Sequence, residues 1–145
     1  MSDPSACLSA LSSSLVDGGA LVLETPNTRG LDARIFGGRH WGGYHTPRHL
    51  FLFNPAALAR LGERAGLNLE SVRALPSPNF WIQSVHHAAS ERAGRIPRYI
   101  SELFQPHPPA PLPLALFTAV DLVARAALGS TSNMRLIFRR AARTC

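Results

Sequence analysis

The fold of this 145-residue chain is decided by residues 18–27, which read Gly-Gly-Ala-Leu-Val-Leu-Glu-Thr-Pro-Asn. The unbroken apolar run at residues 20–23 is typical of a strand buried on both faces of a sheet. The Gly-Gly pair before it favours the end of a preceding helix. Residues 24–27 would lie at the carboxyl end of the strand, where open α/β sheets bind their ligands. We therefore expect a mixed α/β fold with a site at this edge.

A helix is predicted before this strand. Asp3 suits an N-cap, and Leu8, Leu11 and Leu15 recur at helical spacing until Gly18 stops the pattern. The serines in this segment are mediocre helix formers, so the helix is expected to depend on packing against the sheet.

A second helix and two further strands are predicted downstream. Asn54 suits an N-cap, Pro55 a first turn and Gly66 a helix stop. Residues 67–75 alternate between apolar and polar types, which predicts a strand with its apolar residues facing inward. Residues 134–139 predict a final strand.

The segment between these strands is predicted to be helical at both ends. Residues 79–93 are compatible with a helix, and residues 106–113 hold five prolines in eight positions, which predicts an extended linker. Residues 114–128 predict a helix with a narrow polar stripe, in which Asp121 and Arg125 are spaced for an ion pair. The other faces of this helix are apolar and need a covering surface.

Residues 36–53 form a long connection that is rich in glycine, histidine, arginine and aromatic residues. Connections longer than about 12–15 residues without structure of their own are usually functional or disordered. Because this one ends in an apolar run, we interpret it as an ordered binding loop.

The composition fits one globular domain and weakens several function classes. The net charge of +6 comes from arginine alone, since the chain contains no lysine. This excludes a Schiff-base or phosphate-loop lysine. The arginines are scattered, whereas nucleic-acid binding usually shows a basic face, so a nucleic-acid partner is not expected.

Cysteine usage and hydropathy favour a cytoplasmic protein. Cys7 and Cys145 lie at opposite ends, without metal-type spacing or a disulfide framework. No signal peptide is evident. The most apolar stretch, residues 112–128, contains two charged residues and falls short of the roughly 20 apolar residues of a spanning helix. No transmembrane segment is therefore expected.

Six segments, spaced in order along the chain, carry a resemblance to a known family. They are Gly18-Gly19, Thr25-Pro26-Asn27, Trp41-Gly42, Pro47-Arg48-His49-Leu50, Phe53 and Ala65-Gly66-Leu67. This order resembles the C-terminal half of S-adenosylmethionine-dependent methyltransferases with the Rossmann-like fold, in the small-molecule branch related to ubiquinone-biosynthesis enzymes. The resemblance covers residues 6 to about 75 and, more loosely, the last strand.

The resemblance implies a partial fold. The family binds S-adenosylmethionine through an N-terminal half with a glycine-rich turn, and no Gly-x-Gly-x-Gly follows a strand here. The three strands would follow the order five-seven-six, which leaves the edge of the first open for a partner chain or a homodimer. The expected divisions are residues 1–145 as one partial domain, 26–54 as a substrate-side loop, 94–113 as a Pro-rich connection and 114–145 as a helix with the terminal strand. The chain is either a truncated reading of a longer gene or a subunit completed by another chain.

The resemblance also implies a substrate site for a small-molecule methyl acceptor. His49 is the candidate general base, since imidazole titrates near neutral pH. The substrate-binding candidates are Thr25, Asn27, Trp41, Tyr44, His45 and Arg48. Each has a structural alternative: a backbone hydrogen bond for His49, loop packing for the rings, a turn for Asn27 and a surface ion pair for Arg48.

Three further interpretations of the sequence concern a metal site, a partner chain and the apolar helix. His40, His45 and His49 invite a metal interpretation, but their spacing on a glycine-rich loop is unlike that of zinc ligands, so no metal is expected. A non-catalytic module that pairs through its open sheet edge is the main alternative. The apolar helix at residues 114–128 suits a membrane surface or burial against the missing half.

Overall fold

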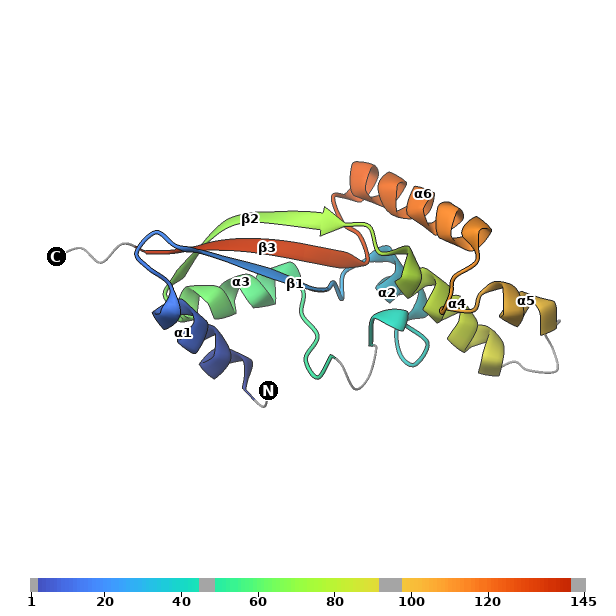
Figure 1. The fold of residues 1–145 in the computed structure, drawn as a ribbon, viewed down its shortest axis with the longest axis horizontal. Helices are drawn as coiled ribbons and strands as arrows, with labels where there is room; N and C mark the ends of the chain where they lie inside the picture. Colours follow the sequence, from blue (N-terminus) through green and yellow to red (C-terminus); the bar gives the residue numbers. More distant parts are fainter. Residues whose placement is uncertain (1–2, 45–48, 92–97, 142–145) are drawn as a thin grey trace.

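The chain folds as a three-stranded sheet with two helices on one face and a group of helices beyond its end (Figure 1). A computed structural model describes residues 3–44, 49–91 and 98–141. The elements in these ranges are α1 (Pro4–Ser14), β1 (Ala20–Pro26), α2 (Leu31–Phe36), the 3-10 turn η1 (Gly42–Tyr44), α3 (Pro55–Arg64), β2 (Leu67–Leu75), α4 (Pro78–Glu91), α5 (Arg98–Leu103), α6 (Pro111–Leu128) and β3 (Asn133–Arg140).

The sheet has the order β1-β3-β2, and β3 runs antiparallel to both neighbours. This is the predicted strand order. In the register, Leu23 lies beside Leu136 and Val72 lies on its other side. A bulge between Leu69 and Ser71 shifts the second half of β2 relative to β3. Because β3 is central, it carries the sheet residues that are most completely buried.

The prediction that the first strand is buried on both faces is wrong. Its side chains alternate between half-buried and exposed from Ala20 to Thr25, and Val22 is 53% exposed. The apolar run of residues 20–23 carries no alternation in the sequence, so burial on a single face was not visible there. β1 is an edge strand whose second face lies open, with Glu24 and Arg135 paired across it at 2.7 Å.

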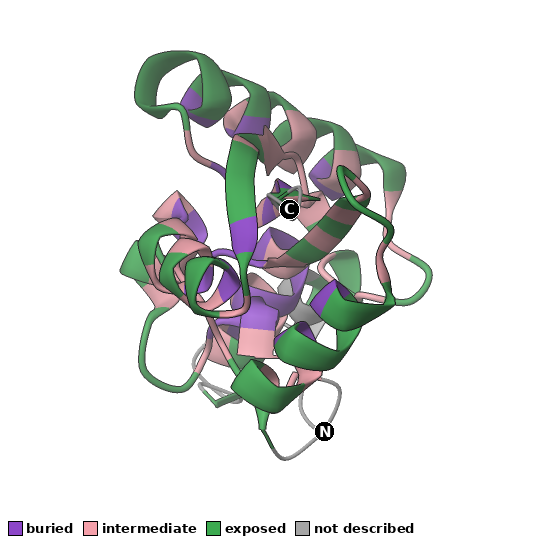
Figure 2. Cartoon of the chain, turned by 90° about the vertical axis from the view of Figure 1, so that its left-hand side faces the viewer, coloured by how far each residue is buried: buried purple, intermediate pink, exposed green. Residues whose placement is uncertain are grey.

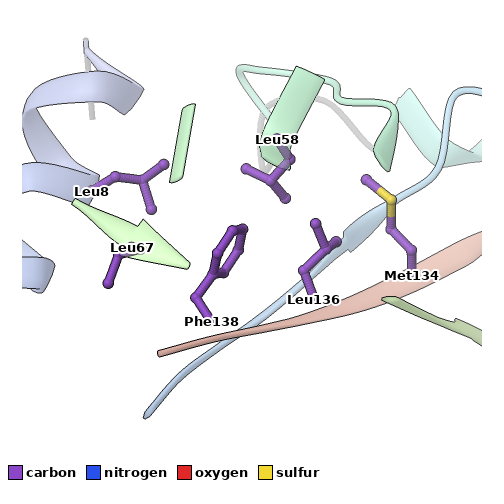
Figure 3. Close-up of a cluster of buried hydrophobic side chains, with 6 residues drawn as sticks. All are labelled: Leu8, Leu58, Leu67, Met134, Leu136 and Phe138. Atoms are coloured by element: carbon purple, nitrogen blue, oxygen red, sulfur yellow. The ribbon is translucent and has the colours of Figure 1, made fainter. Parts of the chain in front are cut away.

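The core lies between the sheet and helices α1 and α3 (Figures 1 and 3). Both helices begin as predicted: Asp3 accepts hydrogen bonds from the N–H groups of Ser5 and Ala6, and Asn54 accepts one from Ala57. The buried cluster consists of Leu8, Leu58, Leu67, Met134, Leu136 and Phe138. Figure 2 shows buried stretches of the chain toward the middle of the molecule and exposed ones over most of its outside.

Several expectations for β2 and the C-terminal helices need correction. β2 spans the predicted residues, but Leu69 and Val72 are 37% and 44% exposed, on either side of the bulge that interrupts the alternation of β2. The Pro-rich connection contains α5, and α6 begins at Pro111, since proline is compatible with the first turn of a helix.

The buried and exposed sides of α6 are the reverse of those predicted from the sequence. Asp121 is 1% exposed and turns inward, where it binds groups of other segments instead of pairing with Arg125. The helix packs on α4 with this side, and its apolar side faces outward. By length and composition alone, with 18 residues and a mean hydropathy of 1.5, α6 is also long and apolar enough to cross a membrane.

Gly62 lets α3 lie directly on the sheet. A Cβ atom at this position would come within 2.3 Å of the Phe138 ring, which is completely buried. We expect Gly62→Ala to lower the free energy of unfolding by about 1–3 kcal/mol through overpacking, despite the better helix propensity of alanine. Urea unfolding measures the change, with Arg60→Ala on the exposed side of α3 as control. A Gly62→Ala protein more stable than wild type would contradict this packing.

Candidate functional site

The loop after β1 is fixed at its base by Asn27. The Asn27 side chain is 3% exposed; its amide donates to Ser130 Oγ and the Thr131 carbonyl, and its Oδ1 accepts from the Arg29 N–H. An isolated bridge pairs Asn27 with Phe53, at the far end of the loop. Asn27 therefore closes the loop by joining its two ends to the turn before β3.

Trp41 is buried in the middle of the loop. It is 2% exposed, and its indole N–H donates to Oδ2 of Asp32 at 2.6 Å. Tyr44 meets the Trp41 ring edge-on, with ring centroids 5.3 Å apart. The Trp41 ring thus packs inside the protein, and a substrate role for it stays a prediction.

Burial raises the pKa of Asp32, although hydrogen bonds from Trp41 and from the Ala33 N–H partly offset the shift. Within the described part of the chain, Oδ1 of Asp32 is buried without a hydrogen-bond partner. A Cβ at Gly30 would lie 2.6 Å from this oxygen, 3.0 Å from the Thr131 carbonyl and 3.1 Å from that of Asn27. Three oxygens thus gather around Gly30, and these surroundings disfavour a negative charge on Asp32.

A second buried carboxylate, Asp121, ties α6 to α4. It accepts hydrogen bonds from the Trp81 indole at 2.9 Å, the Ser77 N–H at 2.6 Å and the Ser132 hydroxyl at 3.3 Å. The Trp81 ring stacks on Phe117 of α6, with centroids 5.4 Å apart. These contacts place the start of β3 against both helices, and they hold in position the helices that support the loop.

One cavity brings together sequence-predicted residues from two parts of the chain. It has a volume of about 350 Å³ and lies between α1, the carboxyl half of β1 and the end of the loop. Thr25 and His49 both line it. The remaining lining residues are Pro4, Cys7, Leu8, Leu11, Leu23, Glu24, Leu50, Phe51, Phe53 and Leu58. A cavity of this size, mostly apolar with a few polar groups, is typical of a small-molecule site.

Other predicted site residues lie elsewhere. Tyr44 lines a separate, more polar cavity of about 420 Å³ with Arg39, Gln83 and His107 among its walls. His45 and Arg48 fall outside the described residues, so their predicted roles stay predictions. Sequence reasoning missed Cys7 as a cavity residue, because it lies one turn into a helix whose leucines suggested only packing. Glu24 also lines the cavity and belongs to the segment 24–27 that was expected at the ligand-binding edge.

The described residues do not fit S-adenosylmethionine, the cofactor implied by the resemblance. Such sites use the free N–H groups of a glycine-rich turn after a strand and an acidic residue at a strand end. At the turn after β1, Asn27 is bonded within the protein and Gly30 lies against Asp32. The strand carboxylates Glu24 and Glu70 are paired with arginines.

The histidines of the loop show no metal centre where the structure describes them. His40 pairs with Glu91, and this hydrogen bond lowers the pKa of Glu91. His49 lies at the other cavity. In residues 3–44, 49–91 and 98–141, no three histidine, cysteine or carboxylate side chains gather in a way that would hold a metal ion.

We expect Asp32→Asn to stabilise the protein at neutral pH. The raised pKa means that the stability supplied by protonated Asp32 is complete below its unfolded pKa of about 3.8 and is lost as the pH rises through the folded pKa. An asparagine keeps an acceptor for Trp41 and offers an N–H₂ donor to the oxygens around Gly30. The advantage of Asp32→Asn should therefore increase from pH 4 to pH 8.

Urea unfolding of both proteins at several pH values measures this difference. Asp17→Asn, which removes an exposed carboxylate, controls for the loss of one negative charge. If the difference in the free energy of unfolding between Asp32→Asn and wild type became smaller as the pH rises, the raised pKa of Asp32 would be contradicted.

Comparison with known proteins bears on the half of the chain that contains β1 and the loop. Residues 1–72 match the model of a methyltransferase domain family, Methyltransf_23. Among solved structures, the chain is similar to the (4+2)-cyclase SpnF, with 18% sequence identity and a TM-score of 0.49. That likeness covers 98% of this chain and 46% of SpnF, so the chain spans less than half of that protein's length. No curated protein matches. The chain is therefore methyltransferase-like, with the match to the methyltransferase domain lying in residues 1–72.

Proposed function

We propose that this chain is the substrate-side part of an S-adenosylmethionine-dependent methyltransferase for a small molecule, and that it is inactive alone. The observation that carries the proposal is the cavity shared by Thr25 and His49 in a methyltransferase-like segment. Thr25 comes from β1 and His49 from the far end of the loop, so folding is needed to bring them together. The branch related to ubiquinone biosynthesis is part of this proposal and rests on the sequence motifs.

The cavity suits the acceptor side of methyl transfer. The methyl donor is already activated in this chemistry, so the protein aligns the acceptor and removes its proton. In our proposal His49 takes that proton, and the Thr25 hydroxyl orients the acceptor atom. The leucine and phenylalanine side chains of the wall would hold an apolar, flat acceptor and exclude water. His45 and Arg48 would contribute polar contacts from the adjoining segment.

The free edge of β1 supports the second part of the proposal, that another chain or segment completes the fold. Hydrogen bonds from Arg140 N–H to the Gly19 carbonyl and from Asn27 N–H to the Ser132 carbonyl direct the odd-numbered residues of β1 toward β3. The backbone groups of Ala20, Val22 and Glu24 therefore point away from the sheet. An unpaired strand edge of this kind can accept a further strand.

The same edge favours a second candidate function, a non-catalytic subunit that binds a partner strand. This alternative needs the edge of β1 and makes no use of the cavity. Val22→Pro removes one outward N–H from the edge without breaking the β1–β3 ladder, so it would weaken such pairing. A cytoplasmic setting and the absence of a nucleic-acid partner belong to both candidates as expectations from the sequence.

Calorimetric titration with S-adenosylhomocysteine tests the inactivity of the chain alone. We expect no heat of binding at micromolar concentrations, because the N–H groups of residues 27–30 in the turn after β1 are already hydrogen-bonded within the protein. Transfer of label from S-adenosylmethionine to any acceptor should also be absent. Micromolar binding by the purified chain, whether monomeric or dimeric on a sizing column, would contradict this part of the proposal.

Binding of 2-naphthol, a flat apolar molecule with one hydroxyl, tests the cavity. We expect saturable shifts in the methyl NMR signals of Leu23 and Thr25, and loss of these shifts in Leu11→Trp, whose ring would fill the cavity mouth. Ala56→Trp, on the exposed side of α3, is the matched control and should leave binding unchanged within about twofold. Equal binding by Leu11→Trp and wild type would remove the cavity from the proposal.

A further inference from the structure

The outward side of α6 is an uninterrupted apolar surface. Eight exposed residues recur at spacings of three and four along the whole helix, and we call them the outer stripe: Leu112, Ala115, Leu116, Ala119, Leu122, Val123, Ala126 and Ala127. Leu112 and Val123 are 71% and 67% exposed. Figure 1 shows α6 on the outside of the molecule, with α4 on its inner side. Spacing of this kind is the pattern of a helix that packs against another helix.

The inner side of α6 is fixed, so the outer stripe cannot turn inward. Asp121 is bound by Trp81, Ser77 and Ser132, and Phe117 stacks on Trp81. Rotating the helix about its axis would remove the Asp121 carboxylate from its hydrogen-bond donors. It would also separate the rings of Trp81 and Phe117. The stripe is thus presented to solvent by the rest of the fold.

We propose that the outer stripe is a dimer interface on which α6 of a second copy packs antiparallel, with Ala119 at the two-fold axis. In that arrangement Leu112 faces Ala126 and Ala115 faces Val123 of the other helix. The smallest contact, alanine against alanine, falls at the crossing point, where two helices approach most closely. The same register sets Leu116 against Leu122 next to the crossing point, while Leu112 and Val123 each face an alanine. The side-chain sizes along the stripe are therefore self-complementary.

Side-chain size favours the antiparallel orientation, because a parallel pair would set Leu112 against Leu112 and Val123 against Val123. Arg125, the exposed charged residue of α6, lies roughly 130° round the helix from the middle of the stripe. It therefore stays outside the contact in either orientation and does not oppose the pairing.

The composition of the stripe favours a second copy over a lipid surface. Half of its residues are alanines, which permit close helix packing but add little to membrane insertion. Helices that lie on membranes carry tryptophan, phenylalanine or leucine on one side and several cations on the other. Here the side opposite the stripe is occupied by Asp121 and α4.

The area of contact indicates a weak dimer. An 18-residue helix is about 27 Å long, so a one-sided helix contact buries roughly 500 Å² per copy, at the low end of specific interfaces. Association is therefore expected in the micromolar range and not at nanomolar concentrations. The dimer would form independently of the free edge of β1 and of the proposed methyltransferase cavity.

Sedimentation velocity of the full chain, from about 1 to about 200 μM, tests the proposal. We expect wild type to shift from monomer to dimer and Ala119→Glu, which sets two carboxylates face to face, to stay monomeric throughout. Ala56→Glu places the same substitution on an exposed position of α3 and should dimerise like wild type. Ala119→Cys should form a disulfide between the α6 helices of two copies under mild oxidation, while Ala56→Cys should not.

Three results would overturn the proposal. The first is a wild-type chain that stays monomeric over the whole range. The second is a dimer that persists in Ala119→Glu and is lost in Val22→Pro, which would assign association to the edge of β1. The third is flotation of monomeric wild type, but not of Ala119→Glu, with vesicles of equal parts phosphatidylcholine and phosphatidylglycerol, which would assign the stripe to lipid.

Discussion

Two buried aspartate side chains link distant segments of this structure, and each accepts a hydrogen bond from an indole N–H. Asp32 binds Trp41 within the loop, and Asp121 binds Trp81 where α4 meets α6. A carboxylate that is removed from water is costly unless donors replace the water, so each pair fixes the segments that supply its two sides. The negative charge of Asp121 also contributes to the raised pKa of Asp32, which couples the two sites electrostatically. Loop, helices and the start of β3 are therefore positioned as one unit.

The sheet supplies a core on one face only. Helices α1 and α3 cover Met134, Leu136 and Phe138, while the other face carries the arginine–glutamate pairs of β1, β2 and β3. Exposed ion pairs add little stability, so the fold relies on the covered face. This asymmetry explains why a free strand edge and an exposed helix side coexist in one small chain: three strands and their helices leave more apolar surface than they can cover.

The candidate site follows from the same architecture. The loop leaves the carboxyl end of β1 and returns at Phe53, which bridges to Asn27. Its far end is thus brought back to the strand, and His49 reaches the cavity that Thr25 also lines. Our proposal assigns the acceptor side of the reaction to these groups, whereas Asn27 in the turn after β1 is already bonded to Ser130 and Thr131. The proposed division between an acceptor side here and a cofactor side elsewhere rests on this difference.

Elements with local sequence signals could be predicted from the amino-acid sequence. The caps at Asp3 and Asn54, the strand at residues 67–75 and the strand order implied by the family resemblance agree with the structure. Which faces of these elements are buried became known from the folded chain alone. The apolar residues 20–23 predict a buried strand, but they do not tell whether one face or both faces are covered. The helical pattern predicts that Asp121 lies on the surface, whereas in the folded chain it is buried and accepts hydrogen bonds from Ser77 and Trp81. Burial depends on contacts between segments distant in sequence, and periodicity within one segment does not encode the partner that covers it.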